Sequence, residues 1–205
     1  MPINVRATVI SILADTPRPE DVFLLDTNVL YWTCYTRALD LASAQGQARK
    51  ARAYSDYVNR ALLAGAQLTK CVVSLTELAH VIERDEYAIF NRRFGTDFTL
   101  KKYRHESGER GKVVEEIQTA WSLAEGITER RVLPVTTDVE ALRSTLSSAA
   151  VDGYDLLIYH AALSGNARQI LTDDVDYGEL SDVQIFTANQ KLIDLAREQG
   201  KLRTR

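Results

Sequence analysis

An abrupt break in a short apolar run constrains the fold of this chain most. Val22–Leu25 ends in Asp26-Thr27-Asn28, and apolar residues at helical spacing follow. A run of Val, Phe and Leu bounded by turn-forming residues is typical of a strand buried on both faces. Asp, Thr and Asn favour helix N-termini, so we expect a helix from here to about Leu41. Asp26 is therefore predicted at the carboxyl end of a central strand, where α/β sheets bind ligands.

Three later junctions between a predicted strand and a predicted helix or turn also carry acidic residues. Residues that follow different parallel strands meet at one edge of the sheet, so we expect these acids to lie together. The acids at these junctions are Glu77, Asp155, Asp174 and Asp176.

Taken one at a time, these acids have structural explanations. An aspartate in the place of Asp26 is more often a helix cap than a metal ligand. Ser74-Leu-Thr-Glu77 matches a capping box, in which the glutamate returns to the backbone amide of the serine. Asp152 is the better placed cap of the next helix. That leaves Asp155 one turn inside an almost wholly apolar helix, where a buried acid needs a partner.

The four junctions together resemble the PIN-domain ribonucleases, the superfamily that includes the VapC-like toxins. The shared features are Asp-Thr-Asn after the first strand, Glu early in a helix, Asp opening a later helix, and Thr-x-Asp-x-Asp-aromatic after another strand. The resemblance runs from Val22 to about Thr187. It implies a three-layer α/β/α sandwich with a mainly parallel central sheet. Residues 1–21 would form an N-terminal arm, and residues 22–205 a PIN-like domain with a helical or loop insertion at about 91–112.

The resemblance also implies roles for the residues at the acidic edge. Thr172 would hydrogen-bond within the cluster, and Asn28 would orient Asp26 or the substrate phosphate. Asp173 remains an alternative to Asp174 as a ligand. The catalytic and metal-binding residues implied are Asp26, Glu77, Asp155 and Asp174, with Asp176 as an outer ligand.

Carboxylates that converge at one edge repel one another, so their pKa values must rise unless a cation neutralises them. Oxygen ligands suit Mg²⁺ or Mn²⁺, whereas Zn²⁺ prefers His or Cys. One or two such ions can bind a scissile phosphate and activate a water molecule. No residue is positioned as a covalent nucleophile. The prediction is a Mg²⁺- or Mn²⁺-dependent endoribonuclease that hydrolyses RNA phosphodiester bonds.

Two alternatives belong to other classes. A phosphatase of the haloacid dehalogenase type needs Asp-x-Asp after its first strand, and here the second position is Asn28, which cannot transfer a proton. A non-catalytic PIN-like module that binds RNA or a protein would show loss of the acids, and all four positions are filled.

Many PIN proteins are toxins that are blocked by an antitoxin. A small DNA-binding protein encoded next door would favour that assignment.

Composition adds few constraints. The chain has 205 residues, of which 45% are hydrophobic, enough for one well-filled core. Cys34 and Cys71 are expected as buried free thiols in a reducing compartment. We expect a cytoplasmic protein without signal peptide or membrane span. Candidate partners are RNA, an antitoxin protein and a second copy of the chain. The net charge of −3 does not exclude RNA binding, because the clustered acids account for it.

Two segments carry an excess of basic residues. Around Asn91–Lys112, basic residues alternate with aromatic ones, a pattern that can grip phosphates and stack bases of single-stranded RNA. The alternative is a polar insertion whose aromatic side chains pack locally. A predicted helix over Gln47–Leu63 carries Arg49, Lys50 and Arg52, which read as a solvated face. The candidate substrate-binding residues in the insertion are Arg92, Arg93, Lys101 and Lys102.

The remaining segments give less specific expectations. Val5–Leu13 has a partly alternating pattern that fits an extra edge strand or an arm. A capping box from Thr137 to Glu140 assigns the acids at 138 and 140 to capping. Thr187 is expected to cap the final helix, and Lys201–Arg205 is expected to be a frayed basic tail.

Overall fold

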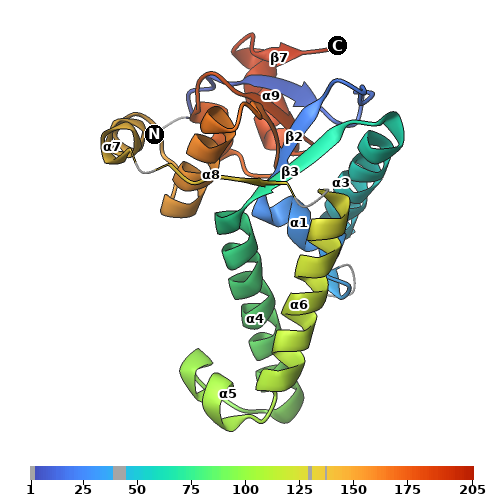
Figure 1. Ribbon diagram of the computed structural model, residues 1–205, viewed down its shortest axis with the longest axis vertical. Coiled ribbons are helices and arrows are strands. Elements are labelled where there is room, and N and C mark those ends of the chain that lie inside the picture. Colours follow the sequence, from blue (N-terminus) through green and yellow to red (C-terminus); the bar gives the residue numbers. More distant parts are fainter. Residues whose placement is uncertain (1–2, 39–44, 129–130, 137) are drawn as a thin grey trace.

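The computed structural model describes residues 3–38, 45–128, 131–136 and 138–205. Its centre is a sheet of seven parallel strands in the order β4-β3-β2-β5-β6-β1-β7 (Figure 1). The fold is therefore α/β, with a parallel sheet between layers of helices, as predicted. The strands are β1 (Thr8–Ser11), β2 (Val22–Leu25), β3 (Gln67–Cys71), β4 (Val132–Leu133), β5 (Gln169–Leu171), β6 (Gln184–Thr187) and β7 (Leu202–Arg203).

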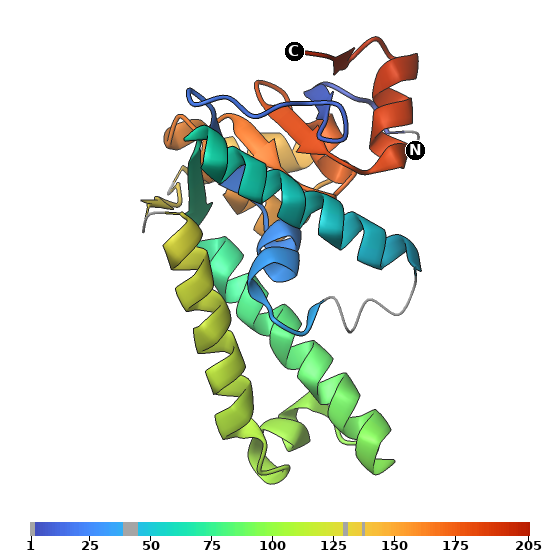
Figure 2. The same cartoon turned by 90° about the vertical axis from the view of Figure 1, so that its right-hand side faces the viewer.

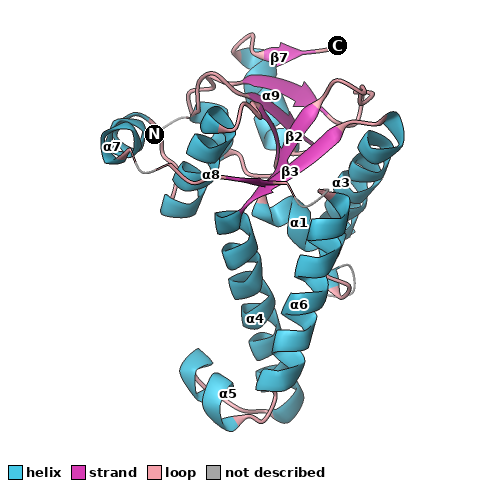
Figure 3. Cartoon of the chain, viewed as in Figure 1, coloured by secondary structure: helices cyan, strands magenta, loops and turns pink. Residues whose placement is uncertain are grey.

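Helices connect most of these strands and cover both faces of the sheet (Figure 3). No helix in the described part of the chain is both long and apolar enough to cross a membrane. The helices are α1 (Thr27–Cys34), α3 (Gln45–Ala64), α4 (Val72–Phe94), α5 (Leu100–Glu106), α6 (Arg110–Ile127), α7 (Val139–Ser148), α8 (Gly153–Ser164), α9 (Gln190–Glu198) and the 3-10 helix η1 (Asp176–Glu179).

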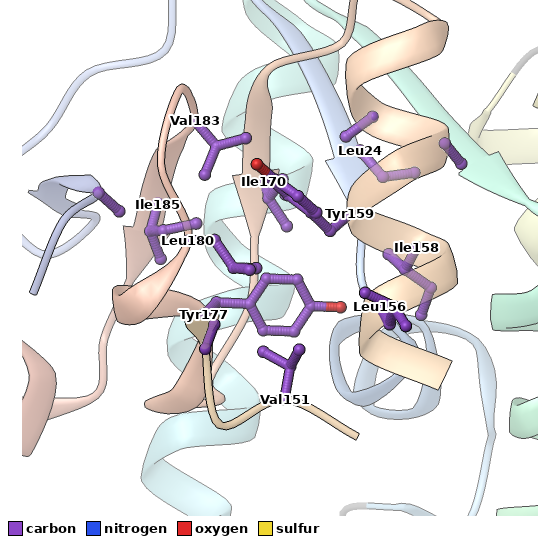
Figure 4. Close-up of a cluster of buried hydrophobic side chains, with 14 of the residues drawn as sticks. Leu24, Val151, Leu156, Ile158, Tyr159, Ile170, Tyr177, Leu180, Val183 and Ile185 are labelled. Carbon is purple, nitrogen blue, oxygen red and sulfur yellow. The ribbon is translucent and has the colours of Figure 1, made fainter. Parts of the chain in front are cut away.

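The core divides into two parts because successive side chains of a strand point to opposite faces. In β2, Leu24 packs into one part with residues of α8 and α9, whereas Phe23 and Leu25 pack into the other with residues of α1, α3, α4 and α6. Each of these three side chains is fully buried, which confirms the prediction of a central strand covered on both faces. Figure 4 shows the first part of the core, where side chains of α8 meet Leu24 and Ile170.

The first residues of the chain belong to the sheet. β1 pairs with β6 on one side and with β7 on the other, so it is neither an edge strand nor a loose arm. Val9 and Ile10 point to opposite parts of the core, and both are buried. The expectation of a frayed C-terminus is wrong as well. Leu202–Arg203 forms the edge strand beside β1, and Arg205 pairs with two buried aspartates.

A helical hairpin projects from the sheet (Figures 1 and 2). Its arms are α4 and α6, which pack against each other, and the short α5 lies at its far end. The insertion predicted over residues 91–112 forms the tip of this hairpin. It comprises the last turn of α4, α5 and the first residues of α6.

The predicted boundaries of the first and the final helix differ from the structure, whereas the predicted cap of α7 is present. The first helix ends at Cys34, well before the predicted Leu41, because Tyr35 takes an extended conformation; positions 39–41 lie outside the described residues. The final helix is capped by Asn189 and not by Thr187, which belongs to β6. At α7, Asp138 caps the helix as predicted, and the other half of that predicted box, position 137, lies outside the described residues.

Candidate active site

The acids at the strand ends line one cleft of about 250 Å³ at the carboxyl edge of the sheet. Asp26 follows β2 directly, and Asp174 lies in the loop after β5, the strand beside β2. Parallel strands bring these residues together, as the sequence predicted. The aromatic side chains of Tyr31 and Trp32 form another wall of the cleft. Its acidic lining consists of Asp26, Glu77, Asp152, Asp155 and Asp174.

Asp26 lines the cleft and is only 2% exposed. Its Oδ1 accepts hydrogen bonds from the Thr27 backbone N–H (2.7 Å) and from the Tyr177 hydroxyl (3.3 Å). Its Oδ2 accepts from Asn28 Nδ2 (2.5 Å) and from Thr172 Oγ1 (2.6 Å). The predicted contacts of Asn28 and Thr172 with Asp26 are therefore present. The helix-cap reading is also confirmed, since Asp26 is the N-cap of α1.

Glu77 does not take part in a capping box, so that prediction is wrong. β3 leads straight into α4, and Cys71 is the N-cap, with its Sγ accepting from the Ser74 backbone N–H (3.4 Å). Glu77 therefore lies in the second turn, beyond reach of the helix start. Its Oε2 instead accepts a hydrogen bond from Thr27 Oγ1 (2.5 Å). Glu77 thus has no capping role. Its carboxylate lines the cleft and is held there by Thr27, the neighbour of Asp26.

The start of α8 matches the prediction for its two acids. Asp152 is the N-cap and accepts from the backbone N–H groups of Tyr154 (2.8 Å) and Asp155 (2.9 Å). Asp155 follows one turn later in a helix whose next residues are mostly buried. Both side chains line the cleft. Asp152 was predicted only as a cap, so its place beside the other acids adds a fifth carboxylate.

The structure distinguishes the neighbouring aspartates after β5. Asp174 lines the cleft, and its Oδ1 accepts from the Asp176 backbone N–H (2.8 Å). Asp173 points elsewhere: its carboxylate accepts from Lys50 Nζ (3.0 Å) and from the Tyr54 hydroxyl (3.0 Å). Asp174 is thus the member of the pair on the cleft side, and Asp173 has a structural ion pair. Asp176 does not line the cleft and starts the 3-10 helix η1.

The electrostatics of the cleft disfavour several ionised carboxylates at once. Burial, followed by repulsion from Glu77 and Asp174, raises the pKa of Asp26 to about 7. Burial and the charges of Asp26, Asp152 and Asp174 raise the pKa of Asp155 to about 8. Burial also raises the pKa of Glu77, as it does that of Asp176. These carboxyl groups stay protonated to higher pH than usual unless a cation enters the cleft.

The donor set fits a hard divalent cation, but its geometry is not that of a formed metal site. Among the described residues, no three acidic, histidine or cysteine side chains are arranged to hold one ion. Hydrogen bonds explain part of this: each oxygen of Asp26 already accepts two, which matches its two lone pairs. An ion at Asp26 would replace one of these donors, and the 3.3 Å bond from Tyr177 is the longest. The oxygen-only chemistry suits Mg²⁺ or Mn²⁺.

The predicted substrate-binding residues lie far from these acids. Arg92 is fifteen residues beyond Glu77 on the same helix, which corresponds to about 22 Å, or roughly four turns. The aromatic residues of the tip pack on one another: the ring of Phe90 lies 4.8 Å from that of Phe94 and 5.5 Å from that of Phe98. The basic residues predicted to bind substrate at this tip are Arg92, Arg93, Lys101 and Lys102.

Two residues of the site were not identified from the sequence. Thr27 bridges Asp26 and Glu77 through its backbone N–H and its hydroxyl. Tyr177 is fully buried with its ring among Val151, Leu156 and Leu180 (Figure 4), and its hydroxyl reaches Asp26. Both belong to motifs that the sequence shows. Thr27 is the middle residue of Asp-Thr-Asn, and Tyr177 is the aromatic residue that ends Thr-x-Asp-x-Asp-aromatic.

Comparisons with known proteins add no assignment. The chain matches no protein-family model, and no curated protein matches its sequence.

Proposed function

We propose that this protein is a Mg²⁺- or Mn²⁺-dependent ribonuclease that hydrolyses RNA at the carboxylate-lined cleft. The observation that carries the proposal is the convergence of five carboxylates in one cleft. Of the described residues that line it, none has a basic side chain. Acids that converge without a cationic side chain repel one another, and Asp26 is in addition buried. Such an arrangement is typical of a site that binds an external cation. A divalent ion bound there would stabilise charge on a scissile phosphate and lower the pKa of a water molecule.

The side chains divide into ligands and supports. Asp26, Glu77, Asp155 and Asp174 would hold the ion, and Asp176 would act from outside through the loop it shares with Asp174. The supporting residues orient these acids: Thr172 and Asn28 each donate to Asp26. Thr172 Oγ1 also accepts from the Asp174 backbone N–H (2.9 Å), which ties the two strand ends together.

The alternatives fit the geometry less well. A phosphatase of the haloacid dehalogenase type needs a proton-transferring acid two residues after Asp26, and Asn28 is an amide that donates to that aspartate. A non-catalytic binding module gives no reason for five acids in one cleft, of which Asp26 is buried. Pairing with an antitoxin is compatible with the proposed activity, and the identity of the neighbouring gene tests it.

The experiment that tests this function is cleavage of single-stranded RNA by the purified protein with Mg²⁺ or Mn²⁺. Asp26→Asn removes the charge and keeps the size of the side chain. We expect cleavage to fall at least about a hundredfold, because the charge that would hold the ion is lost. The matched control is Asp138→Asn, the same change at an exposed helix cap outside the cleft. Asparagine caps a helix as well as aspartate does, so this variant should keep full activity.

Stability decides whether a loss of activity in Asp26→Asn is specific. Near pH 8 the variant gains stability because repulsion from Glu77 and Asp174 is relieved. The asparagine Nδ2 cannot accept the hydrogen bonds that reach one oxygen of Asp26, which offsets part of this gain, so we expect the variant to remain folded. Full activity in a folded Asp26→Asn protein would contradict the proposed function and leave Asp26 as a helix cap.

A further inference from the structure

A second concave surface lies on the other side of α3. This groove, of about 630 Å³, has one wall formed by the residues after β1, Ile12 and Leu13. Its other wall is a single side of α3, whose members recur at helical spacing. The α3 residues in the groove are Ala48, Arg49, Arg52, Ala53, Asp56 and Arg60. We name this surface the α3 groove.

The three arginines of the α3 groove differ in their contacts. Arg60 has a structural role: its Nη1 donates to the backbone oxygen of Asp15 (2.9 Å) and its Nη2 to that of Ile12 (3.1 Å). Arg49 and Arg52 are exposed, and within the described residues neither forms an ion pair or a side-chain hydrogen bond. Among the described residues of the groove, Asp56 is the one acid. Two guanidinium groups are thus directed to solvent in a concave surface of net positive charge, which suits a phosphate backbone.

α3 separates this groove from the acidic cleft, and its contacts connect the two. The ring of Tyr54 stacks on Trp32 at 5.1 Å between centroids, and Trp32 lines the cleft. Lys50, next to Arg49, pairs with Asp173, the neighbour of the cleft acid Asp174. α3 therefore contacts both the cleft residue Trp32 and the loop that carries Asp174, and Lys50 is the chain neighbour of the exposed Arg49.

The hairpin tip is less suited than the α3 groove to bind a single-stranded RNA. Arg104 and Arg110 both pair with the buried Glu83, and Lys112 pairs with Glu109. The Nζ of Lys102 lies 4.4 Å from the centroid of the Phe98 ring. Much of the positive charge of the tip is therefore neutralised or packed, and the tip is about 22 Å along α4 from Glu77.

We propose that the α3 groove binds the phosphate backbone of a single-stranded RNA substrate where it leaves the acidic cleft, through Arg49 and Arg52. This inference rests on the proposed ribonuclease function. Narrow acidic clefts repel a polyanion, so a basic surface beside the cleft would provide the affinity that the cleft lacks.

The test is RNA binding by Arg49→Gln/Arg52→Gln, measured in the Asp26→Asn background so that the RNA is not cut. Glutamine keeps helix propensity and removes the charge. The matched control is Arg143→Gln/Arg197→Gln, which removes two exposed arginines from α7 and α9. The probe is a labelled, unstructured oligouridylate, and binding is measured over a series of salt concentrations.

We expect the groove variant to bind about tenfold more weakly at low salt. The slope of log affinity against log salt should flatten by about 1.4, since each single-strand phosphate contact contributes about 0.7. The control should keep the slope of the parent. Equal slopes in the groove variant and the parent, or no RNA binding by the parent, would overturn the proposal.

Cleavage by the natural protein separates the two proposals. If it cuts RNA and the groove variant binds with an unchanged slope, the α3 groove is excluded while the ribonuclease stands. If the groove variant binds with a flattened slope but the natural protein cuts no RNA with either metal, the groove is supported and the ribonuclease function fails.

Discussion

Two groups of carboxylates in this fold contain buried aspartates, and the groups differ in how their charge is balanced. Asp15 and Asp21 are 5% and 3% exposed, similar to the 2% of Asp26. Arg205 lies between the first two: its Nε is 2.8 Å from Asp15 Oδ1, and its Nη2 is 2.7 Å from Asp21 Oδ2. In the acidic cleft, by contrast, the lining in the described part of the chain includes no Lys, Arg or His.

The pKa values of the two groups follow this difference. Burial alone would raise the pKa of Asp21, but hydrogen bonds from Arg205, the Arg18 backbone N–H and Gln169 outweigh it and lower the pKa. For Asp26, burial and neighbouring acids raise the pKa to about 7 in spite of the bonds from Thr172 and Thr27. Asp15 and Asp21 thus form ion pairs with Arg205, whereas the negative charge of the cleft aspartates is not balanced by a basic side chain of the described lining. The difference supports the proposal that the cleft binds a cation from solution.

The largest change in stability is expected when the balanced group loses its cation. Arg205→Gln would leave Asp15 and Asp21 buried without a charge partner, which typically costs about 3 kcal/mol or more. Hydrogen bonds from Tyr57 to Asp15 and from Gln169 to Asp21 keep the loss near the lower limit. Urea denaturation measures this change.

The control for that prediction is Arg203→Gln, the same change in β7 at an exposed side chain without an ion pair in the described structure. It should alter the unfolding free energy by less than about 0.5 kcal/mol. Equal effects of the two substitutions would show that the Arg205 ion pairs do not stabilise the fold.

The next largest expected effect is a difference in the pH dependence of stability between the cleft acids and the aspartates that pair with Arg205. The raised pKa values of Asp26 (about 7) and Asp155 (about 8) mean that, between about pH 4 and 8, the folded state keeps protons that the unfolded chain has lost. Stability of the metal-free protein should therefore fall as the pH rises through this range, by at most about 1.4 kcal/mol per pH unit for each group.

Asp21 has the opposite sign. Its pKa is lowered, so its contribution is present above the unfolded value, about pH 4, and is lost as the pH falls further. Urea midpoints measured from pH 4 to 9 should thus decline toward high pH, and Asp26→Asn/Asp155→Asn should flatten the decline. A natural protein whose stability rises from pH 5 to 8 in the absence of metal would contradict the charge imbalance in the cleft.

The smallest effect is expected at the hairpin tip. Replacement of Arg92, Arg93, Lys101 and Lys102 by Ala should barely change the melting temperature, because their side chains are mostly exposed. If RNA follows the α3 groove, the slope of affinity against salt should also stay within error of the natural protein. If the slope flattened as much as in Arg49→Gln/Arg52→Gln, the hairpin tip would also bind the RNA substrate.

Sequence reasoning succeeded where local pattern decides the structure. The run Val22–Leu25 and its Asp-Thr-Asn ending gave the central strand and the start of α1, because burial and capping are local preferences. It failed where tertiary contacts decide. The alternation in Val5–Leu13 fits any half-buried strand, and only pairing with β6 and β7 places it inside the sheet.

The site shows the same limit. Convergence of the acids follows from parallel topology and was predictable, whereas the choice between Asp173 and Asp174 depends on Lys50 from a distant helix. The capping box at Ser74 failed because β3 and α4 join without a loop, which moves the helix start to Val72. In the same way, the basic residues at the C-terminus do not predict that Arg205 lies between two buried aspartates.

Calorimetric titration with Mn²⁺ near pH 7, in two buffers that differ in protonation enthalpy, tests the central claim most directly. Binding should release protons, because Asp26 and Asp155 hold them at this pH and a cation displaces them. Asp26→Asn should bind much more weakly and release fewer protons, whereas Asp138→Asn should behave like the natural protein. No heat of binding at millimolar Mn²⁺, or equal affinity in the Asp26→Asn variant, would contradict a metal site in the cleft.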